Sequence, residues 1–346
     1  MTETVTYEDV FAAEPIVHRW LPRTPLYEYP LLSRRLGCQF WLKHENHQPV
    51  GAFKVRGGVN LVHSLSEEER QRGIIAVSTG NHGSSLAWAC RQLGVRCTIV
   101  VPSEGNPDKK TLMRALGAQL IEYGRDFDEA KDYCEQLACG EMPFPSALIP
   151  GGMTTSHFPR YVHSANEPTL IAGVGTYALE IFEALPDPAV ILVPIGLGSG
   201  ICGVALVAKR RSPSTRVIGV QAEGAPAVTQ SWRSGRLVTT ETIATRAEGM
   251  ATRAPAELTL EIMRRLVDDI VLVSESEIDD AVALLLAMTH NLAEGAGAAS
   301  TAAAFKLRHE LQGKKVVGVL SGGNLDLRTL PAICGRLPQL PNEEVS

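Results

Sequence analysis

The arrangement of apolar and polar residues along the chain predicts strands and helices in alternation. Short runs rich in β-branched residues, typical of buried strands, recur at 73–78, 97–102, 119–124, 189–194, 216–222, 269–274 and 315–321. Segments with helical periodicity lie between many of them, among them 83–94, 108–118, 126–138 and 275–293. Strands that are apolar throughout and separated by helices are typical of a parallel sheet covered on both faces. The pattern therefore predicts an α/β fold with two open, mostly parallel sheets and helices on both faces.

An irregular, proline-bearing segment at 139–168 interrupts this alternation. The chain has 346 residues, a length that favours about two domains. We therefore place a domain crossover near residue 150. We expect residues 1–72 plus 151–346 to form a large domain, and residues 73–150 to form a small one.

Composition excludes several classes of protein. The chain is 45% hydrophobic, carries a net charge of −5 and has no long run of Lys or Arg, so it lacks the basic surface of nucleic-acid or membrane-surface binders. The acidic N-terminal segment has no apolar core typical of a signal peptide, and the aliphatic run 281–288 is too short to span a bilayer. Seven cysteines without a Cys-x-x-Cys pair are typical of reduced thiols. We expect a cytoplasmic protein with no nucleic-acid and no membrane partner.

Candidate chemistry gathers in loops that follow predicted strands. These loops are STGNHGSS at 78–85, PIGLGSGICG at 194–203 and SGGN at 321–324. Ligands of open parallel sheets bind beyond the carboxyl ends of strands, where loops and helix starts offer N–H groups. A further candidate is Lys54 in GAFKVRGG, where apolar neighbours and glycines, interpreted as turns, predict a sheltered amine. Desolvation lowers the pKa of such a lysine and makes its amine available for reaction.

The loop after the strand at 189–194 also matches a dinucleotide-binding pattern. Gly198-x-Gly200-x-x-Gly203 precedes a predicted helix, and Glu223 follows about twenty residues later. The pattern normally opens its sheet, however, and here it lies in the middle of the chain. Alternating glycines also suit a single phosphate, and tight strand–helix packing is a third explanation. A dinucleotide-binding oxidoreductase is therefore kept as an alternative.

Several segments, in this order, resemble the fold-type II pyridoxal-phosphate (PLP) enzymes, which are tryptophan synthase β-like. Within this group they resemble the threonine/serine dehydratase (ammonia-lyase) and serine racemase branch. The segments are the run from Arg23 to GAFKVRGG, then STGNHGSSLAWAC, VPIGLGSG and VLSGGN, with support from 166–181 and 292–300. The resemblance covers about residues 16 to 328, nearly the whole chain. It implies a large cofactor-binding domain and a small substrate-binding domain.

The resemblance also implies roles for residues around PLP. Lys54 would hold the cofactor as a Schiff base and act as the base, with Phe53 packing on the ring. Asn81 would hydrogen-bond the cofactor's 3′-oxygen, and Ser321 would face the pyridine nitrogen. Glu294 would lie near the ring or, alternatively, be a structural acid at a helix terminus. The cup for the cofactor phosphate would comprise Gly196, Leu197, Gly198, Ser199 and Gly200.

The substrate carboxylate would bind at the asparagine loop. Its expected contacts are Ser78, Thr79, Gly80, Asn81 and His82, through N–H groups at a helix start. Capping of that helix by Ser78 and Thr79 is compatible with this role. For His82, packing beneath the loop without contact to substrate is an equal alternative.

The implied reaction is α,β-elimination from a β-hydroxy amino acid, giving a 2-oxo acid and ammonia. The neutral Ser321 hydroxyl does not hold a pyridinium as a carboxylate would, which favours elimination over transamination. Serine or amino-acid racemase activity is the alternative, because Thr79 stands where racemases of the branch carry an acid/base serine. A non-catalytic binding module is a further alternative, against which the intact Lys54, Asn81 and Ser321 argue.

Substrate choice, metal binding and assembly are less constrained. Ala165 in HSANEP replaces a Phe of the branch, which predicts a larger pocket and a bulkier substrate, such as phenylserine or a hydroxyectoine-derived amino acid. A surface loop with no pocket role explains Ala165 equally well. No metal is expected, because Thr229 stands where the branch has an aspartate ligand after Glu223. We expect a small-molecule amino-acid substrate, a catabolic role and a homodimer or homotetramer.

Overall fold

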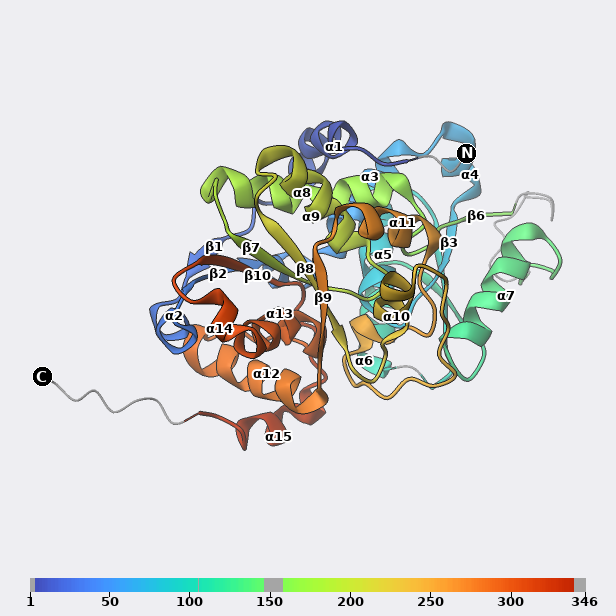
Figure 1. Ribbon diagram of the computed structural model, residues 1–346. Helices are drawn as coiled ribbons and strands as arrows, with labels where there is room; N and C mark the ends of the chain where they lie inside the picture. The colour runs from blue at the N-terminus through green and yellow to red at the C-terminus, as the bar shows by residue number, and fades with distance from the viewer. Residues whose placement is uncertain (1–3, 105, 146–157, 339–346) are drawn as a thin grey trace, which may run out of the picture.

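A computed structural model describes residues 4–104, 106–145 and 158–338 (Figure 1). Its larger sheet has six strands in the order β1-β2-β10-β7-β8-β9. Only β1 is antiparallel to its neighbour; the other pairs are parallel. The strands are β1 Leu26–Glu28, β2 Gln39–His44, β7 Val190–Pro194, β8 Arg216–Ala222, β9 Asp269–Val273 and β10 Lys315–Leu320.

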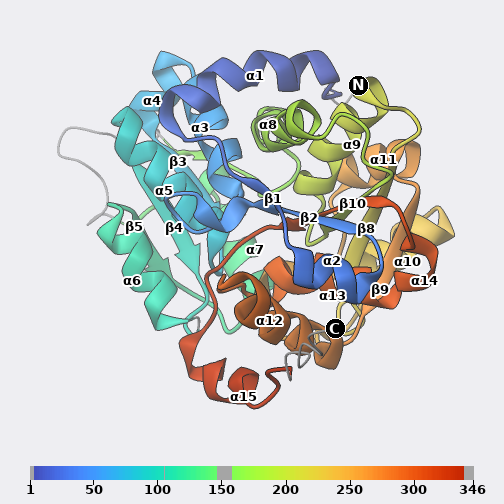
Figure 2. The ribbon, with the colours of Figure 1, turned by 90° about the vertical axis from the view of Figure 1, so that its left-hand side faces the viewer.

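The smaller sheet has four parallel strands in the order β5-β4-β3-β6. They are β3 Ile74–Val77, β4 Cys97–Val101, β5 Gln119–Glu122 and β6 Arg160–Tyr161. Figure 2 shows β3, β4 and β5 side by side, next to α5 and α6. The predicted fold class is therefore confirmed: an α/β chain with two mostly parallel sheets.

The helices lie between the strands in sequence and cover both sheets. They are α1 Tyr7–Trp20, α2 Pro30–Leu36, α3 Lys54–Ser64, α4 Glu67–Arg72, α5 Asn81–Leu93, α6 Pro107–Ala115, α7 Phe127–Cys139, α8 Pro168–Ala184, α9 Ser199–Arg211, α10 Ala227–Ser234, α11 Glu257–Leu266, α12 Glu275–Thr289, α13 Gly295–Lys306, α14 Arg308–Leu311 and α15 Leu330–Cys334. Short 3₁₀ turns are η1 Glu45–His47, η3 Glu248–Met250 and η4 Leu327–Thr329.

Alternate residues of the central strands face opposite hydrophobic cores. In β7, Ile191 and Val193 join the core formed with α1, α8, α9 and α11, whereas Leu192 joins the core formed with α2, α12 and α13. Figure 1 shows these two groups of helices on opposite sides of the larger sheet. Since both faces are covered, the strands are apolar throughout, which is why the sequence revealed them.

The predicted domain division stays a prediction. The segment chosen for the crossover near residue 150 lies partly in 146–157, outside the described residues. Strand β6 pairs with β3, however, so the smaller sheet takes a strand from beyond the predicted boundary. This pairing favours a second boundary after Tyr161.

The glycines that follow Lys54 lie within a helix, not in turns as interpreted from the sequence. Gly57 and Gly58 belong to α3 and allow its close packing with two other helices. A Cβ on Gly57 would lie 2.7 Å from the Leu170 carbonyl oxygen in α8, and one on Gly58 would lie 3.0 Å from the Ser85 carbonyl oxygen in α5. Contacts this short require glycine, so these residues fix the position of the helix that begins at Lys54.

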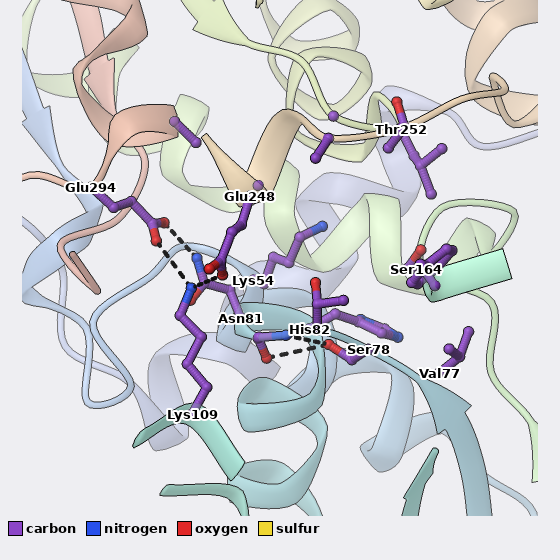
Figure 3. A pocket seen from close by; sticks show the side chains of 18 of the residues that line it. Lys54, Val77, Ser78, Asn81, His82, Lys109, Ser164, Glu248, Thr252 and Glu294 are labelled. Carbon is purple, nitrogen blue, oxygen red and sulfur yellow. Dashed lines mark hydrogen bonds and ion pairs between the residues drawn. The ribbon is translucent and has the colours of Figure 1, made fainter. Parts of the chain in front are cut away.

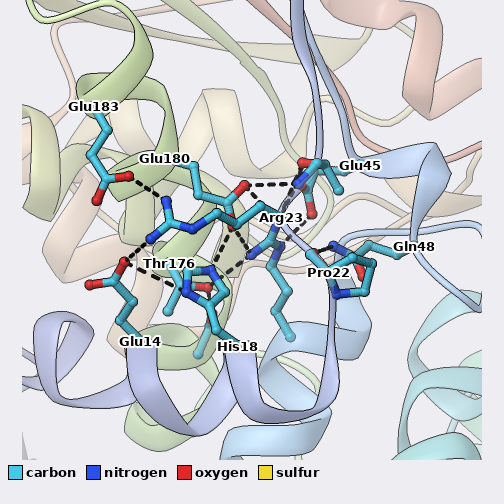
Figure 4. A network of polar contacts seen from close by, with 12 residues as sticks. Glu14, His18, Pro22, Arg23, Glu45, Gln48, Thr176, Glu180 and Glu183 are labelled. Atoms are coloured by element: carbon cyan, nitrogen blue, oxygen red, sulfur yellow. Dashed lines mark hydrogen bonds and ion pairs between the residues drawn. The ribbon is translucent and has the colours of Figure 1, made fainter.

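A buried ionic network anchors the same helix (Figure 4). Arg56, fully buried in α3, donates to both carboxylate oxygens of Glu45 at 2.7 and 2.9 Å and to Glu180 at 2.6 Å. Glu180 also pairs with the buried Lys43 of β2. Although burial itself raises the pKa of Glu180, the Arg56 and Lys43 charges lower it to about 2. The network therefore joins α3, α8 and β2 just behind Lys54.

Candidate active site

The predicted site residues converge on one cavity of about 480 Å³ at the carboxyl ends of strands from both sheets (Figure 3). The loops after β3, β7 and β10 line it, together with the start of α3. Its lining includes every residue predicted for the site: Phe53, Lys54, Ser78, Thr79, Gly80, Asn81, His82, Gly196, Leu197, Gly198, Ser199, Gly200, Glu294 and Ser321. The roles of these residues remain proposals, but the fold brings all of them together.

Lys54, the first residue of α3, extends into this cavity. Burial lowers the pKa of its amine to about 8, and the nearby Glu294 charge opposes this shift only in part. Its Nζ lies 5.2 Å from the centroid of the Phe53 ring. Among the described residues, none places a carboxylate within ion-pair distance of Lys54. With this pKa roughly one tenth of the amine is neutral at pH 7, far more than with the ordinary value of 10.5, and a nucleophile or a general base requires this neutral form.

Backbone contacts hold the Lys54 loop against the loop after β10. Ala52 and Gly322 form an isolated antiparallel bridge, and the Phe53 N–H donates to the Ser321 carbonyl at 3.0 Å. Gly51 has a φ of +69°, and a Cβ there would lie 2.5 Å from the Asn324 side-chain oxygen. These contacts place Lys54 and the buried Ser321 hydroxyl on the same cavity.

The glycine-rich loop after β7 lines the cavity at the start of α9 and packs closely against neighbouring segments. Gly198, the residue that caps this helix, has a φ of +101°, and a Cβ there would lie 3.0 Å from Thr259. A Cβ on Gly196 would lie 2.3 Å from the Gly249 carbonyl, and one on Gly200 would lie 3.2 Å from the Phe53 ring. First-turn N–H groups have no partner within the helix, so they favour an anion here.

The asparagine loop contains both a helix-capping side chain and N–H donors at the start of α5. The Ser78 hydroxyl accepts from the Gly80 and Gly83 N–H groups at 3.0 and 2.8 Å, so it stabilises the start of α5. The Ser78 N–H donates to the Val100 carbonyl. Of the N–H groups predicted for a substrate carboxylate, those of Ser78 and Gly80 thus already have protein acceptors. Those of Thr79, Asn81 and His82 are better placed for this role.

His82 is buried at the cavity, and its Nε2 has no hydrogen-bond partner among the described residues. Burial, with the Lys54 and His163 charges, lowers its pKa to about 3. The ring is therefore neutral at physiological pH and does not serve as a general acid there.

Asn81 is held between two polar side chains. Its Oδ1 accepts from Asn324 Nδ2 at 2.8 Å, and its Nδ2 donates to Glu294 Oε1 at 2.5 Å. Glu294 is the N-cap residue of α13, but its side chain makes no capping hydrogen bond and instead lines the cavity. This geometry favours the predicted position of Glu294 near a ligand ring over a structural acid at a helix terminus.

Sequence reasoning missed Lys109 and Glu248, which also line the cavity. Lys109 lies on α6 beside the smaller sheet and forms an ion pair with Glu248 in η3, next to the larger sheet. Lys109 follows a strand end, in a helix that begins with Asn-Pro, so its position near the edge of the sheet was a usable signal. Glu248 lies in an irregular segment, and no sequence pattern indicated it.

The family model for pyridoxal-phosphate dependent enzymes matches residues 18–322. The chain belongs to this family. Over 332 residues the enzyme is 40% identical to the L-threonine ammonia-lyase of Thermotoga maritima, covering 96% of this chain and 79% of that protein. It is also 37% identical to the L-threo-3-hydroxyaspartate ammonia-lyase of Saccharomyces cerevisiae, covering 93% of this chain and 94% of that protein. The structure of maize serine racemase is similar, with a TM-score of 0.85 and 28% identity, covering 95% of this chain and 97% of that one.

The residues present fit the cofactor of the family. A lysine amine, a side-chain-free cradle at a helix start and a hydroxyl on Ser321 match an aldehyde, a phosphate and a pyridine nitrogen respectively. The predicted cofactor, pyridoxal 5′-phosphate, and the predicted enzyme class, a PLP-dependent lyase, are confirmed. The dinucleotide alternative is wrong. Glu223 does not line the cavity, and a Cβ on Gly203 would lie 2.6 Å from the Gly175 Cα, so this glycine serves helix packing.

The side chain predicted to enlarge the pocket does not line it. Ala165 is fully buried and its N–H donates to the His163 Nδ1, whereas the neighbouring Ser164 faces the cavity. The segment does border the pocket, but the residue chosen from the sequence was wrong, because the turn around His163 points Ala165 inward.

The region considered for a metal has protein partners instead. Lys306 Nζ lies 3.3 Å from Glu223 Oε1 and 3.1 Å from Glu277 Oε2, and the Thr229 hydroxyl donates to Gln221. Within the described ranges, His, Cys, Asp and Glu form no cluster of three that would hold a metal ion.

Proposed function

We propose that the enzyme is an ammonia-lyase that converts a β-hydroxy amino acid, such as threonine or serine, to a 2-oxo acid and ammonia. The observation that carries this proposal is the sheltered amine of Lys54, with its pKa lowered to about 8, in a cavity that also offers an anion cradle and donors at the start of α5. The names of its relatives support the same reaction, since two of them are ammonia-lyases of hydroxy amino acids.

Different residues of the chain have different roles in the proposed reaction. The cofactor, when bound, withdraws electrons from the substrate's Cα and so makes its proton removable. Lys54 is placed to hold the cofactor and then, as a neutral amine, to accept the Cα proton. The N–H groups of Asn81 and His82 orient the carboxylate, and the loop from Gly196 to Gly200 binds the phosphate. Ser321, being uncharged, favours rapid loss of the β-hydroxyl.

A panel of substrates tests the proposal. Purified enzyme supplied with PLP should release a 2-oxo acid and ammonia in equal amounts from at least one of L-threonine, L-serine, L-threo-3-hydroxyaspartate and L-threo-phenylserine. Hydride reduction followed by mass spectrometry should find the cofactor attached at Lys54. Attachment at another lysine, or no product from any β-hydroxy amino acid, would contradict the proposal.

A bulkier substrate remains a finer proposal with a different basis from Ala165. Pro102, Phe127 and Ile243 line the cavity together with the small Ser164 and Ala251. This apolar lining is suited to a β-substituent larger than the methyl group of threonine. A higher kcat/KM for phenylserine, or for a hydroxyectoine-derived amino acid, than for threonine would support it, and a clear preference for threonine would refute it.

Racemase activity is the second candidate, because the similar maize structure is a serine racemase and Thr79 lines the cavity. Chiral analysis of serine after incubation with the enzyme distinguishes the two reactions.

We further propose a catabolic, cytoplasmic homodimer or homotetramer. Among the helices that the structure describes, none combines the length and apolar character needed to cross a membrane.

A further inference from the structure

Lys109 lies at the boundary between the two sheets, where one ammonium meets two carboxylates. Its Nζ forms an ion pair with Glu248 and lies 4.0 Å from Glu294 Oε2. Figure 3 shows the three side chains directed toward one another across the cavity, with Asn81 beside them. The function proposed above assigns Lys109 no task, although it lines the same cavity as Lys54.

The two acids around Lys109 differ in their environment. The Glu294 side chain is 8% exposed, whereas that of Glu248 is 41% exposed. Solvent therefore screens Glu248, while Glu294 depends on protein groups for stabilisation of its charge. Burial lowers the pKa of Lys109, whereas the Glu294 charge, the Glu248 charge and the hydrogen bond to Glu248 raise it, so both acids act on this ammonium. Asp326 is a further acid that acts on Lys109, and Lys54 is the other cation near Glu294.

The charge of Glu294 determines the hydrogen bond to Asn81. Burial raises the pKa of Glu294, the Lys109 charge and the Asn81 hydrogen bond lower it, and the Glu248 charge raises it. As a carboxylate, Glu294 accepts from Asn81 Nδ2. A protonated Glu294 has one oxygen that donates instead, while the Asn81 oxygen is already engaged by Asn324. Protonation of Glu294 would therefore weaken the hydrogen bond that positions the Asn81 side chain, which is proposed to contact the cofactor.

We propose that Lys109 is a positioning residue that keeps Glu294 ionised, and thereby fixes Asn81, from the opposite side of the cleft. This inference rests on the proposed function for its effect on turnover, but the coupling between Lys109 and Glu294 exists independently of it. Glu248 then holds the Lys109 ammonium from the solvent-exposed side and competes with Glu294 for the interaction with its positive charge. Lys109 consequently links the contact between α6 and η3 to the protonation state of the site.

We expect two matched substitutions at the Lys109–Glu248 ion pair to shift the pKa of Glu294 in opposite directions. Lys109→Met removes the cation and leaves Glu248, so the pKa of Glu294 rises. Opposite charges at this range shift a pKa by about 1–3 units. The acidic limb in the pH dependence of kcat/KM should therefore move to higher pH by about the same number of units. Glu248→Gln removes a negative charge near Glu294 and leaves the Lys109 ammonium to interact with Glu294 alone. The pKa of Glu294 should therefore fall, and the acidic limb should move to lower pH by a smaller amount. Lys109→Arg should restore the wild-type profile.

A merely structural ion pair predicts a different result, because both substitutions break the same contact. Its loss would move the two profiles in the same direction or lower turnover at every pH without a shift. Either outcome, or a Lys109→Met profile that coincides with that of the wild type, would overturn the proposal. Thermal unfolding of each variant identifies any general loss of folding.

A titration of the cofactor-free protein provides the readout that does not depend on turnover. Carboxyl carbons of ¹³C-labelled glutamate are followed by NMR, and the Glu294 signal is assigned by its loss in Glu294→Gln. Its midpoint should rise in Lys109→Met and fall in Glu248→Gln. An unchanged midpoint refutes the inference even if the wild type is an active lyase. Shifted midpoints in a protein without lyase activity would refute the proposed function and leave the coupling intact.

Discussion

Lys43 and Lys54 are both sheltered lysines, yet their surroundings make them opposites. Lys43 donates to the Thr24 carbonyl at 2.7 Å and pairs with Glu180, inside a network where Arg56 and Glu45 balance the remaining charges. Burial lowers the pKa of Lys43 as well, but Glu45 and Glu180 oppose that shift. Its ammonium therefore has a carbonyl and a carboxylate as protein acceptors and has a structural role.

Lys54 has the same side chain, but among the residues that the structure describes it has no such partners. Burial lowers its pKa to about 8, and Glu294 acts on it only at a distance. The difference teaches that burial alone does not make a lysine reactive. A sheltered amine is available for chemistry when the surrounding protein supplies no paired carboxylate and leaves a cavity in front of it.

The largest expected difference between the two lysines is in turnover. Lys54→Met should lower lyase activity by about 10²–10⁴-fold or more, because the proposed base is gone. The hydride-trapped cofactor label should disappear as well. Activity assays and mass spectrometry check this, and a variant that retains wild-type turnover would exclude Lys54 from the reaction.

Removal of the other lysine should affect folding instead. Lys43→Met breaks a buried pair and leaves Glu180 with one cation fewer, which should lower the free energy of unfolding by about 3–5 kcal/mol. Urea unfolding of the cofactor-free protein measures this. If Lys43→Met were as stable as the wild type, the network around Arg56 would not depend on this lysine.

The stability of the cofactor-free protein should respond to Lys54 in the opposite direction. Its folded pKa of about 8 lies below the ordinary value of 10.5, so the charged form costs stability at every pH below about 8. Lys54→Met should therefore stabilise the protein by about 2–3 kcal/mol at pH 7. The gain should shrink as the pH rises from 8 to 10.5 and vanish above 10.5, where both states are neutral. A gain independent of pH would show that packing, not charge, is responsible.

The smallest effect is expected at the exposed ion pairs around Lys306. Its partners Glu223 and Glu277 are 49% and 35% exposed, so Lys306→Met should change the free energy of unfolding by less than about 1 kcal/mol.

A chelator should leave turnover unchanged. Loss of activity on chelation, restored by a divalent cation, would contradict the expectation that no metal is needed.

Much of the fold was readable because its strands are buried on both faces. The runs at 216–222 and 269–274, for instance, correspond to β8 and β9 almost to the residue. Three strands escaped detection. The edge strands β1 and β6 have only two or three residues and carry too little periodicity, and β2 contains the buried polar residues Lys43 and His44, which interrupt its apolar run. The helix at Gly57 and Gly58 was also missed, because glycine has low helix propensity and its reason for being there is a neighbouring helix.

The sequence by itself predicted many of the residues that line the cavity, because ordered motifs mark Lys54, Asn81, the loop at 196–200 and Ser321. It did not determine how their charges interact. Only the tertiary structure brought Lys109 and Glu248 from different sheets to the same cavity, gave Lys43 partners that Lys54 lacks, and turned Ala165 away from the pocket. Electrostatic interactions depend on distance and burial, and both arise from contacts between segments far apart in the chain.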